Sequence, residues 1–521
     1  MRPALPCDMP RIDLTERKGY DCPQSVERGA MVWESGMNRR SFLTKTVAAA
    51  VSLPAAPYLR AQGANDAIRL AIVGMGSKVK IGGMGRNDMK GCRAVPGVRI
   101  AALCDVDSAN LGYALEECAK HNEKPETFTD YRKLLERKDI DAVWVTTPNH
   151  WHALVCIHAA QAGKHVFVQK PVCHNLFEGR KMVEAARAHN RVVYSSTLTR
   201  SMAGFREAAR FAVDGNLGKP LYIHAVRYGA RTSIGKVAGP TPIPPTLDYN
   251  LWCGPAPMKP LMRQNLHYDW HWDWDTGNGE LGNWGIHLLD GAREVAGQGM
   301  PKSVLSVGGR FGYDDDGQTP NTQITFFDYE PLPIIYEMRA LPRARSSWKN
   351  GAWGQQDMDA LHGQSYTTSV QCEEGYTVGN KAYDKAGKLV KEFKPALRSV
   401  RAAFFDAVRG GAGTPHYDIA EAHVSTSLVH LGNIAHRLGR QAAPEQIRER
   451  LAFNADFLKT WERMFAHLDA NGIDLSKTPP TLGPFLRFDP AAERFTGDFA
   501  DEANRYLARE YRKGFEVPDK V

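Results

Sequence analysis

The sequence lacks any run of 18 or more consecutive apolar residues, so it predicts no membrane-spanning helix in the mature protein. Its nine cysteines form no C-x-x-C pair and have no zinc-type spacing, which argues against the common structural metal sites. The net charge of +8 at pH 7 is spread along the chain, without the dense basic patch of a nucleic-acid-binding surface. We therefore expect no metal, no nucleic-acid partner and no membrane span.

The length of 521 residues is too great for a single core and indicates two or three domains. An apolar fraction of 43% and a charged fraction of 24% are typical of globular proteins. We expect an upstream extension with an export signal, two folded domains, and a tail that wraps over both. The corresponding residues are 1–65, 66–199, 200–440 and 441–521.

Residues 37–61 read MNRRSFLTKTVAAAVSLPAAPYLRA, in which Arg39 and Arg40 precede a short apolar stretch. This order of residues is typical of a twin-arginine export signal, here with cleavage near Ala61. A fortuitous basic and apolar start is the alternative. The pattern predicts a periplasmic or secreted protein that folds, and collects any cofactor, before export.

A short apolar segment, IRLAIV at 68–73, runs directly into Gly74-Met75-Gly76. A strand that ends in G-x-G is half of the dinucleotide-binding fingerprint, in which glycines let a pyrophosphate approach the backbone at a helix N-terminus. Val79 stands at the third glycine position of that fingerprint. Further glycines follow just beyond, as if the turn carried an insertion, at Gly82, Gly83 and Gly85. We assign Gly74 and Gly76 to cofactor binding; a glycine-rich loop that binds nothing is the alternative.

The next apolar segment, VRIAALCD at 98–105, ends in Asp105. An acid at this point of a dinucleotide fold accepts hydrogen bonds from the adenosine ribose and repels a 2′-phosphate. Asp105 therefore favours NAD, with NADP possible, although the same residue could instead cap the helix that follows.

Strand-like and helix-like segments then alternate up to about residue 196, which predicts a Rossmann domain with a doubly wound parallel sheet. Ligands of such sheets bind beyond the carboxyl ends of the strands. The residues at two of these strand ends are Thr147, Pro148, Asn149, Gln169 and Lys170. We expect these residues and Asp105 to line one crevice.

From about residue 200 the sequence changes in texture and predicts an α+β domain with a largely antiparallel sheet. Its expected strands include LYIHAVRY (221–228), SVLSVGGRF (303–311) and TQITFFDY (322–329). Helices are expected around 398–409 and 419–438. The whole chain is thus expected to be an α/β protein with the second sheet packed on the first domain.

Residues 265–290, NLHYDWHWDWDTGNGELGNWGIHLLD, are rich in tryptophan, histidine and acids. Aromatic faces stack on the C–H faces of sugars, while polar side chains bond their hydroxyls, so this segment favours a carbohydrate ligand. A buried aromatic loop at the domain junction is the alternative. We assign Arg200, Tyr268 and Trp272 as substrate contacts.

In the order of its motifs the chain resembles the Gfo/Idh/MocA oxidoreductase family over residues 66–521. That family has a T-P-x-x-x-H segment, an E-K-P tripeptide and a G-x-x-G-D-x-G-x-H-x-x-D segment. Here these motifs read TPNHWH (147–152), QKP (169–171) and GELGNWGIHLLD (279–290). Residues 488–518 resemble the tail of exported members.

The resemblance implies roles for individual residues. Lys170 would contact the nicotinamide ribose and the reacting hydroxyl, and a cis bond would precede Pro171. His152 would line the cofactor site, and His287 would be the proton donor or acceptor at the substrate. Asp290 would support His287 or a helix.

Two positions depart from the family pattern. Gln169 replaces the acid of E-K-P, which removes a negative charge beside Lys170. Asn283 replaces the aspartate four residues before His287, and an amide can position a hydroxyl but cannot relay a proton. We expect Lys170 and His287 to be catalytic, and Asn283 and His287 to contact the substrate.

Together, the resemblance and the aromatic segment predict an NAD(P)-dependent oxidoreductase that acts on the carbinol carbon of a sugar, sugar derivative or cyclitol. Because free NAD is scarce outside the cytoplasm, we expect a tightly bound, recycled cofactor. The alternatives are NAD-dependent, redox-neutral glycoside cleavage by a hydrolase or lyase, and a non-catalytic sugar-binding relative. We also expect a homo-oligomer formed through the C-terminal sheet.

Overall fold

The computed structural model describes residues 67–78, 82–297, 299–349, 356–396 and 399–521. The predicted export signal and Val79 lie outside the described residues. Across the described ranges, no helix is both long enough and apolar enough to cross a membrane.

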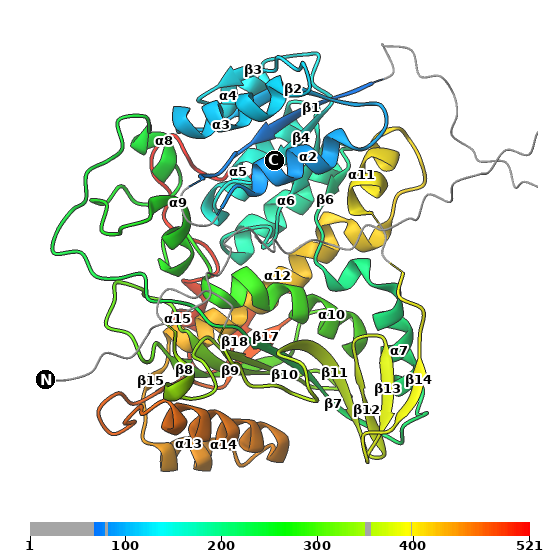
Figure 1. The fold of residues 1–521 in the computed structure, drawn as a ribbon, viewed down its shortest axis with the longest axis vertical. Helices are drawn as coiled ribbons and strands as arrows, with labels where there is room; N and C mark the ends of the chain where they lie inside the picture. Colours follow the sequence, from blue (N-terminus) through cyan, green and yellow to red (C-terminus); the bar gives the residue numbers. More distant parts are fainter. Residues whose placement is uncertain (1–66, 79–81, 298, 350–355, 397–398) are drawn as a thin grey trace, which may run out of the picture. The chain divides into compact units, whose positions relative to one another are not determined.

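The first domain holds a parallel sheet of six strands within the described residues, in the order β3-β2-β1-β4-β5-β6 (Figure 1). The strands are β1 (Ile68–Val73), β2 (Val98–Cys104), β3 (Glu126–Phe128), β4 (Ala142–Val145), β5 (His165–Val168) and β6 (Val193–Tyr194). The helices between them are α2 (Met84–Arg93), α3 (Ser108–Ala119), α4 (Tyr131–Leu135), α5 (Asn149–Gln161) and α6 (Leu176–Ala188). This doubly wound order confirms the predicted Rossmann fold.

Helices cover both faces of this sheet, which explains why β4 is fully apolar without alternation. Helices α5 and α6 pack on one face. On the other face Trp144 stacks on Phe167, with ring centroids 3.8 Å apart. Phe404 of α11 (Val400–Val408) lies edge-on to Trp144 at 5.7 Å. A helix that follows the second domain's hairpins thus completes the core of the first domain.

The second domain is built on a mixed sheet of twelve strands, counted over the part of the chain that the structure describes. Its main path runs β14-β13-β12-β11-β7-β10-β9-β8-β16-β15, and only β7 and β10 pair in parallel along the described path. The strands are β7 (Pro220–Tyr228), β8 (Ser303–Gly309), β9 (Thr322–Phe327), β10 (Ile334–Arg339), β11 (Tyr366–Cys372), β12 (Gly375–Val378), β13 (Lys381–Asp384), β14 (Leu389–Glu392), β15 (Arg440–Gln441), β16 (Thr481–Leu482), β17 (Leu486–Asp489) and β18 (Arg494–Thr496). The predicted, largely antiparallel sheet is confirmed.

Both faces of the second sheet also carry helices. Helices α10 (Ile286–Ala296) and α12 (Ile419–Arg437) pack on one face, and α12 also contacts α6 of the first domain. On the other face, α13 (Pro444–Leu451) and α14 (Ala455–Ala470) bury apolar side chains against β8, β9 and β10. The remaining α-helices of the described residues are α7 (Ala203–Val213), α8 (Tyr249–Cys253), α9 (Leu266–Asp269) and α15 (Ala500–Asn504).

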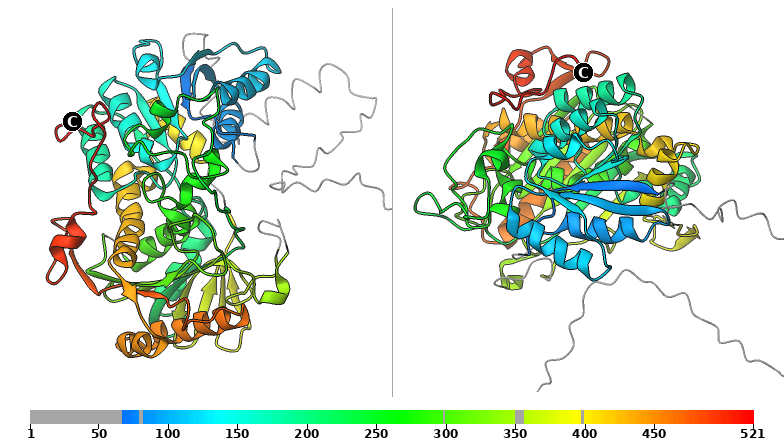
Figure 2. Two further views of the ribbon diagram at one scale, coloured as in Figure 1. Left: turned by 90° about the vertical axis from the view of Figure 1, so that its left-hand side faces the viewer. Right: turned by 90° about the horizontal axis from the view of Figure 1, so that it is seen from above.

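The segment after α14 runs from the second sheet back to the first domain, and Figure 2 shows it in red beside the helices of that domain. Strand β17 pairs with β8. Further along, Phe515 and Val517 are buried in the first domain's core. Tyr511 donates its hydroxyl to the carboxylate of Glu178 in α6, at 3.2 Å. The C-terminal segment therefore fastens the two domains together.

Candidate active site

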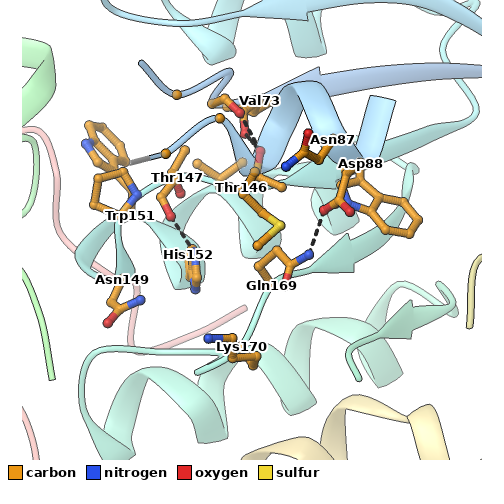
Figure 3. Close-up of a pocket in the computed structure, with 18 of the residues that line it drawn as sticks. Val73, Asn87, Asp88, Thr146, Thr147, Asn149, Trp151, His152, Gln169 and Lys170 are labelled. Carbon is orange, nitrogen blue, oxygen red and sulfur yellow. Dashed lines mark hydrogen bonds between the residues drawn. The ribbon is translucent and has the colours of Figure 1, made fainter. Parts of the chain in front are cut away.

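A cavity of about 720 Å³ lies where the strand ends of the first sheet meet the second domain (Figure 3). All the residues that the sequence assigns to the cofactor line it: Gly74, Gly76, Asp105, Thr147, Pro148, Asn149, His152, Gln169 and Lys170. Of the predicted substrate contacts, Tyr268, Asn283 and His287 line it, whereas Arg200 and Trp272 do not. The fold therefore brings the two catalytic candidates and the glycine turn into one space.

The glycine turn after β1 has the backbone of a phosphate-binding loop. Gly74 and Gly76 have φ angles of 91° and 71°, and a Cβ on Gly74 would lie 2.8 Å from the Thr147 nitrogen. Gly85, in α2, takes the place of the third fingerprint glycine, because a Cβ there would lie 1.9 Å from the Gly74 carbonyl oxygen. The insertion between Gly76 and Gly85 hid this role from the sequence motif. Because these glycines carry no side chain, a dinucleotide pyrophosphate can approach the backbone of the turn.

Asp105 faces this turn from the end of β2. Its carboxylate accepts hydrogen bonds from the backbone nitrogen of Met75 at 2.7 Å and from that of Asp107 at 2.9 Å. Burial raises the pKa of Asp105, and those backbone donors oppose the rise. The side chain thus stands beside the glycine turn at the place where an adenosine ribose is bound in this fold.

The segment after β4 is held by His152. Its Nδ1 lies 2.8 Å from the Pro171 carbonyl oxygen and its Nε2 lies 2.8 Å from that of Thr147. Burial lowers the pKa of His152 to about 4, so the ring is neutral near pH 7. His152 therefore lies between two strand-end turns of the cavity wall, and as a neutral ring it donates its one N–H to one of these two carbonyl oxygens.

Lys170 reaches from the end of β5 to the second domain. Its Nζ donates to the backbone carbonyl oxygen of Asn283 at 2.5 Å, and the Lys170–Pro171 peptide is cis, as the resemblance implies. Burial lowers the pKa of Lys170 to about 8, while the charge of Glu280 raises it and that of Arg231 lowers it. A lysine with this pKa can exchange a proton near neutral pH.

The acceptor of this bond belongs to a π-helical turn, Leu281–Gly285, which leads into α10. Such wide turns often occur at functional sites because they shift the backbone register of the helix. Here the turn presents the side chains of Asn283 and Trp284 to the cavity. The same turn precedes His287.

His287 lies in the first turn of α10 and its Nδ1 accepts a hydrogen bond from the backbone nitrogen of Leu198 at 3.2 Å. Burial, reinforced by the charge of Lys170, holds the pKa of His287 well below its ordinary value. A neutral imidazole whose Nδ1 accepts must carry its proton on Nε2. His287 therefore offers the cavity an N–H donor.

A carboxylate lies beside Gln169, although residue 169 itself is an amide. Its Nε2 donates to the Asp88 carboxylate at 2.6 Å, a bond drawn in Figure 3. Asp88, in α2, also accepts from Trp144 Nε1 at 2.8 Å and from Arg401 of α11 at 2.6 Å. No local sequence signal predicts this role, because Asp88 lies outside every motif described above.

Asn283 stands in a similar arrangement. Its Nδ2 donates to the buried carboxylate of Glu280 at 3.2 Å. Arg231, which follows β7, donates to the other oxygen of Glu280 from Nε at 3.0 Å and from Nη2 at 2.7 Å. Glu280 falls at a variable position of the family pattern, so the sequence alone did not single it out.

The structure places Arg200 and Trp272 away from the proposed substrate site. The Arg200 guanidinium binds both oxygens of Asp290 at 2.6 Å, and both side chains are buried. Burial would raise the pKa of Asp290, but Arg200 outweighs it and holds the pKa below its ordinary value. Trp272 is only 2% exposed and packs near Tyr268. Arg200 and Asp290 thus hold the domain junction together, and Trp272 belongs to the buried part of the aromatic segment.

The histidines of the aromatic segment also have structural partners. His267 lies 2.8 Å from the carboxylate of Asp107, and His271 Nδ1 lies 2.6 Å from the Tyr268 carbonyl oxygen. Among the described residues, no group of three His, Cys, Asp or Glu side chains is arranged to hold a metal ion.

Comparison with known proteins gives two matches to protein families. Residues 68–197 match the oxidoreductase family with an NAD-binding Rossmann fold, and residues 214–307 match its C-terminal α/β domain. Both matches are to models of the Gfo/Idh/MocA family.

Curated relatives match about a third of the chain. Inositol 2-dehydrogenase from Salmonella paratyphi B is 29% identical over 30% of this chain and 46% of its own length. A glycosyl hydrolase family 109 protein from Shewanella baltica is 30% identical over 31% of this chain and 36% of its own length. The chain thus spans less than half the length of these relatives.

The fold is shared more widely than the sequence. A crystal structure from Desulfitobacterium hafniense, described as an oxidoreductase, has a TM-score of 0.50 at 13% identity over 70% of this chain and 95% of that chain. With a doubly wound sheet and a glycine turn, residues 68–197 match the NAD-binding Rossmann domain of the Gfo/Idh/MocA oxidoreductase family, and residues 214–307 match the C-terminal domain of that family.

Proposed function

We propose that the protein is an NAD-dependent oxidoreductase acting on the carbinol carbon of an uncharged sugar, sugar derivative or cyclitol. The observation that carries this proposal is the place of Lys170, whose Nζ is fixed on the Asn283 carbonyl in the cavity that also holds the glycine turn and His287. NAD, when bound, supplies the hydride acceptor. The protein's own residues hold the substrate and move the proton.

Lys170 is the proposed base. With a pKa of about 8, about a tenth of the side chain is neutral at pH 7 and can accept the hydroxyl proton. The positive charge of an oxidised nicotinamide nearby lowers that pKa further. His287 donates its Nε2–H to the same substrate oxygen, which stabilises the negative charge that develops there.

The cavity's side chains support an uncharged, hydroxyl-rich substrate. Tyr268, Trp270 and Trp284 line it and offer aromatic faces to the C–H faces of a sugar or cyclitol ring. Among the described lining residues, the lysines and arginines are Lys170 and Arg401, and Arg401 is ion-paired with Asp88. A substrate carboxylate or phosphate would therefore pair with Lys170 and interfere with its role as the base. The similarity to inositol 2-dehydrogenase points to the same class.

Export and cofactor recycling form a further part of the proposal. The twin-arginine pattern at 37–61 supports a periplasmic or secreted protein. In a compartment poor in free NAD, such an enzyme would keep its cofactor bound between reactions. We also propose a homo-oligomer through the C-terminal sheet. Because α13 and α14 cover β8–β10, its contact would fall on the strands near Tyr376 and Tyr383, which stack at 5.4 Å.

A second candidate is redox-neutral cleavage of a glycoside. Transient oxidation of a carbinol would acidify the neighbouring C–H, and loss of that proton would eliminate the aglycone, which takes up a proton and leaves as the alcohol. Water would then add, and return of the hydride would reduce the product. The similarity to glycosyl hydrolase family 109 proteins supports it. The same two groups would serve, Lys170 at the hydroxyl and His287 at the resulting oxygen. A non-catalytic sugar-binding relative is the third candidate, but it gives no reason for a buried lysine held between two domains.

One experiment separates these candidates. The folded protein is denatured, and released NAD(H) and NADP(H) are measured; absence of both would contradict the recycling proposal. Wild type and Lys170→Met are then assayed with cyclitols, neutral sugars, uronates and aryl glycosides. We expect reduction of an electron acceptor, or of a second sugar, by neutral polyols only. Release of an aglycone without net NADH would instead establish glycoside cleavage.

A further inference from the structure

Two amide side chains on the cavity wall share an arrangement that the sequence does not reveal. Gln169 and Asn283 come from different domains, and each donates its NH₂ group to a buried carboxylate. Neither carboxylate belongs to a proposed catalytic residue. The carboxylates belong to Asp88, which is 2% exposed, and Glu280, which is 1% exposed. Each carboxylate is in turn held by an arginine.

At the first amide, the Asp88 carboxylate accepts from three donors. Its Oδ2 accepts from Gln169 at 2.6 Å and from Trp144 at 2.8 Å, while its Oδ1 accepts from Arg401 at 2.6 Å. These donors stand on three elements, namely the end of β5, β4 and α11. Asp88 cannot shift without losing one of them, so it is a fixed acceptor.

At the second amide, Glu280 is fixed in the same way. Oε1 accepts two hydrogen bonds from Arg231, and Oε2 accepts from Asn283 at 3.2 Å. Glu280 lies just before the π-helical turn whose carbonyl, that of Asn283, receives the Lys170 ammonium. Each carboxylate therefore stands behind an amide of the cavity wall, and the charge of Glu280 acts on Lys170.

The chemistry of these bonds sets the orientation of both amides. An ionised carboxylate accepts hydrogen bonds and donates none, so each amide must turn its NH₂ toward it. The carbonyl oxygen of each amide then faces away from the carboxylate and can accept from a ligand; the Asn283 side chain also has a hydrogen bond with Tyr268. An amide without such a partner could present either end.

We propose that Asp88 and Glu280 are positioning residues that turn Gln169 and Asn283 so that both present a carbonyl oxygen to cofactor and substrate hydroxyls, with the negative charges held back from Lys170. This inference rests on the proposed function, in which Lys170 acts as the base. A carboxylate at residue 169 or 283 itself would stabilise the ammonium, raise the pKa of Lys170 and reduce the fraction of the lysine that is neutral at pH 7. Placing the charge behind a neutral amide keeps an acceptor for hydroxyls while leaving the lysine free to lose its proton.

The test exchanges the two groups of the first pair. Asp88→Asn combined with Gln169→Glu keeps an amide–carboxylate hydrogen bond, and the amide oxygen introduced at residue 88 can still accept from Arg401, while Trp144 loses its acceptor and the negative charge moves to residue 169, next to Lys170 in the chain. The rate at which a small acylating reagent modifies Lys170, mapped by mass spectrometry across pH, reports its deprotonation without needing a substrate. We expect the midpoint to rise by about one pH unit or more, and turnover at pH 7 to fall about tenfold with KM little changed.

The single variant gives the opposite sign. In the second pair, Glu280→Gln removes the negative charge that raises the pKa of Lys170, so the labelling midpoint falls, while turnover drops because Asn283 loses its fixed orientation. Glu178→Gln is the matched control, because Glu178 is a fully buried carboxylate that also accepts from an amide, that of Asn175 at 2.9 Å, but lies outside the cavity. It should change stability and leave the Lys170 midpoint in place.

An exchange variant with the wild-type midpoint and turnover would overturn the proposal. If that variant does not fold, Glu280→Gln alone decides, since a midpoint that fails to fall contradicts the inference. Asn283→Asp with Glu280→Gln repeats the test at the second pair. Should the wild type release no dinucleotide and oxidise no substrate, the proposed function fails, and the labelling midpoints still report whether Asp88 and Glu280 act on the lysine.

Discussion

Lys170 Nζ donates to the backbone carbonyl oxygen of Asn283 at 2.5 Å, which ties a strand end of the first domain to the π-helical turn of the second. The bond gives the lysine one position at the domain junction. Because its acceptor is a carbonyl and not a carboxylate, it orients the ammonium without adding a negative charge beside it.

Replacing Lys170 by Met should lower turnover by about 10²–10⁴-fold, because the proposed base is lost while the chain's shape is kept. Bound NAD should remain. Lys164→Met is the matched control, since Lys164 is also buried and donates to a backbone carbonyl, that of Arg137 at 2.8 Å, away from the cavity. Equal effects of the two substitutions would contradict the role of Lys170.

The rate of oxidation should rise with pH and level off above about pH 8, because burial lowers the pKa of Lys170 to about 8 and only the neutral amine accepts a proton. The same shift affects stability. A folded-state pKa below the ordinary value of a lysine means that the folded protein binds fewer protons between pH 8 and 10.5, so stability rises with pH across that window. Denaturant unfolding of wild type and Lys170→Met, compared at pH 7 and 10, measures this difference.

Gly85→Ala should remove bound NAD and destabilise the fold by about 1–3 kcal/mol, because its Cβ would lie 1.9 Å from the Gly74 carbonyl oxygen. Gly112→Ala in α3 is the control, since a Cβ there meets nothing within 4 Å. This control substitution should raise the free energy of unfolding by about 0.4–1 kcal/mol. Retention of NAD at wild-type levels by Gly85→Ala would mean that this glycine does not shape the turn.

Arg200→Met should cost about 3–5 kcal/mol of unfolding free energy, because it leaves the fully buried Asp290 carboxylate without its counter-charge. Arg187→Met, which breaks an exposed pair with Asp418, should cost at most about 1 kcal/mol. Chemical denaturation compares them. Unchanged stability with a raised KM would instead restore Arg200 to the substrate site.

Local patterns predicted much of this arrangement. Apolar strands that end in Gly74, Asp105, Thr147 and Lys170 are short-range features, and the parallel order of the sheet follows from their alternation with helices. That order alone places all the strand ends on one edge, so the cofactor side of the cavity could be assembled from the sequence. The family motif then supplied His287 and Asn283.

What sequence patterns missed depends on contacts between distant segments. Asp88 and Glu280 matter because they accept hydrogen bonds from Gln169 and Asn283. No rule of sequence spacing predicts those hydrogen bonds. Gly85 was obscured by the insertion before it. The Arg200 side chain is of a type that often binds substrates. Only the position of α10 shows that its guanidinium is already paired with Asp290.

Phe404 lies against Trp144, although strands β7 to β14 of the second domain separate the two residues in the chain, and this separation has a consequence for biosynthesis. A nascent chain that has just completed the six-stranded sheet still exposes the stacked indole and phenyl rings of Trp144 and Phe167. This exposed aromatic surface persists until α11 leaves the ribosome. The nucleotide-binding domain therefore completes its folding late and needs protection from aggregation until then. An excised fragment ending near residue 199 would keep the surface exposed permanently, which makes it a poor tool for measuring cofactor affinity.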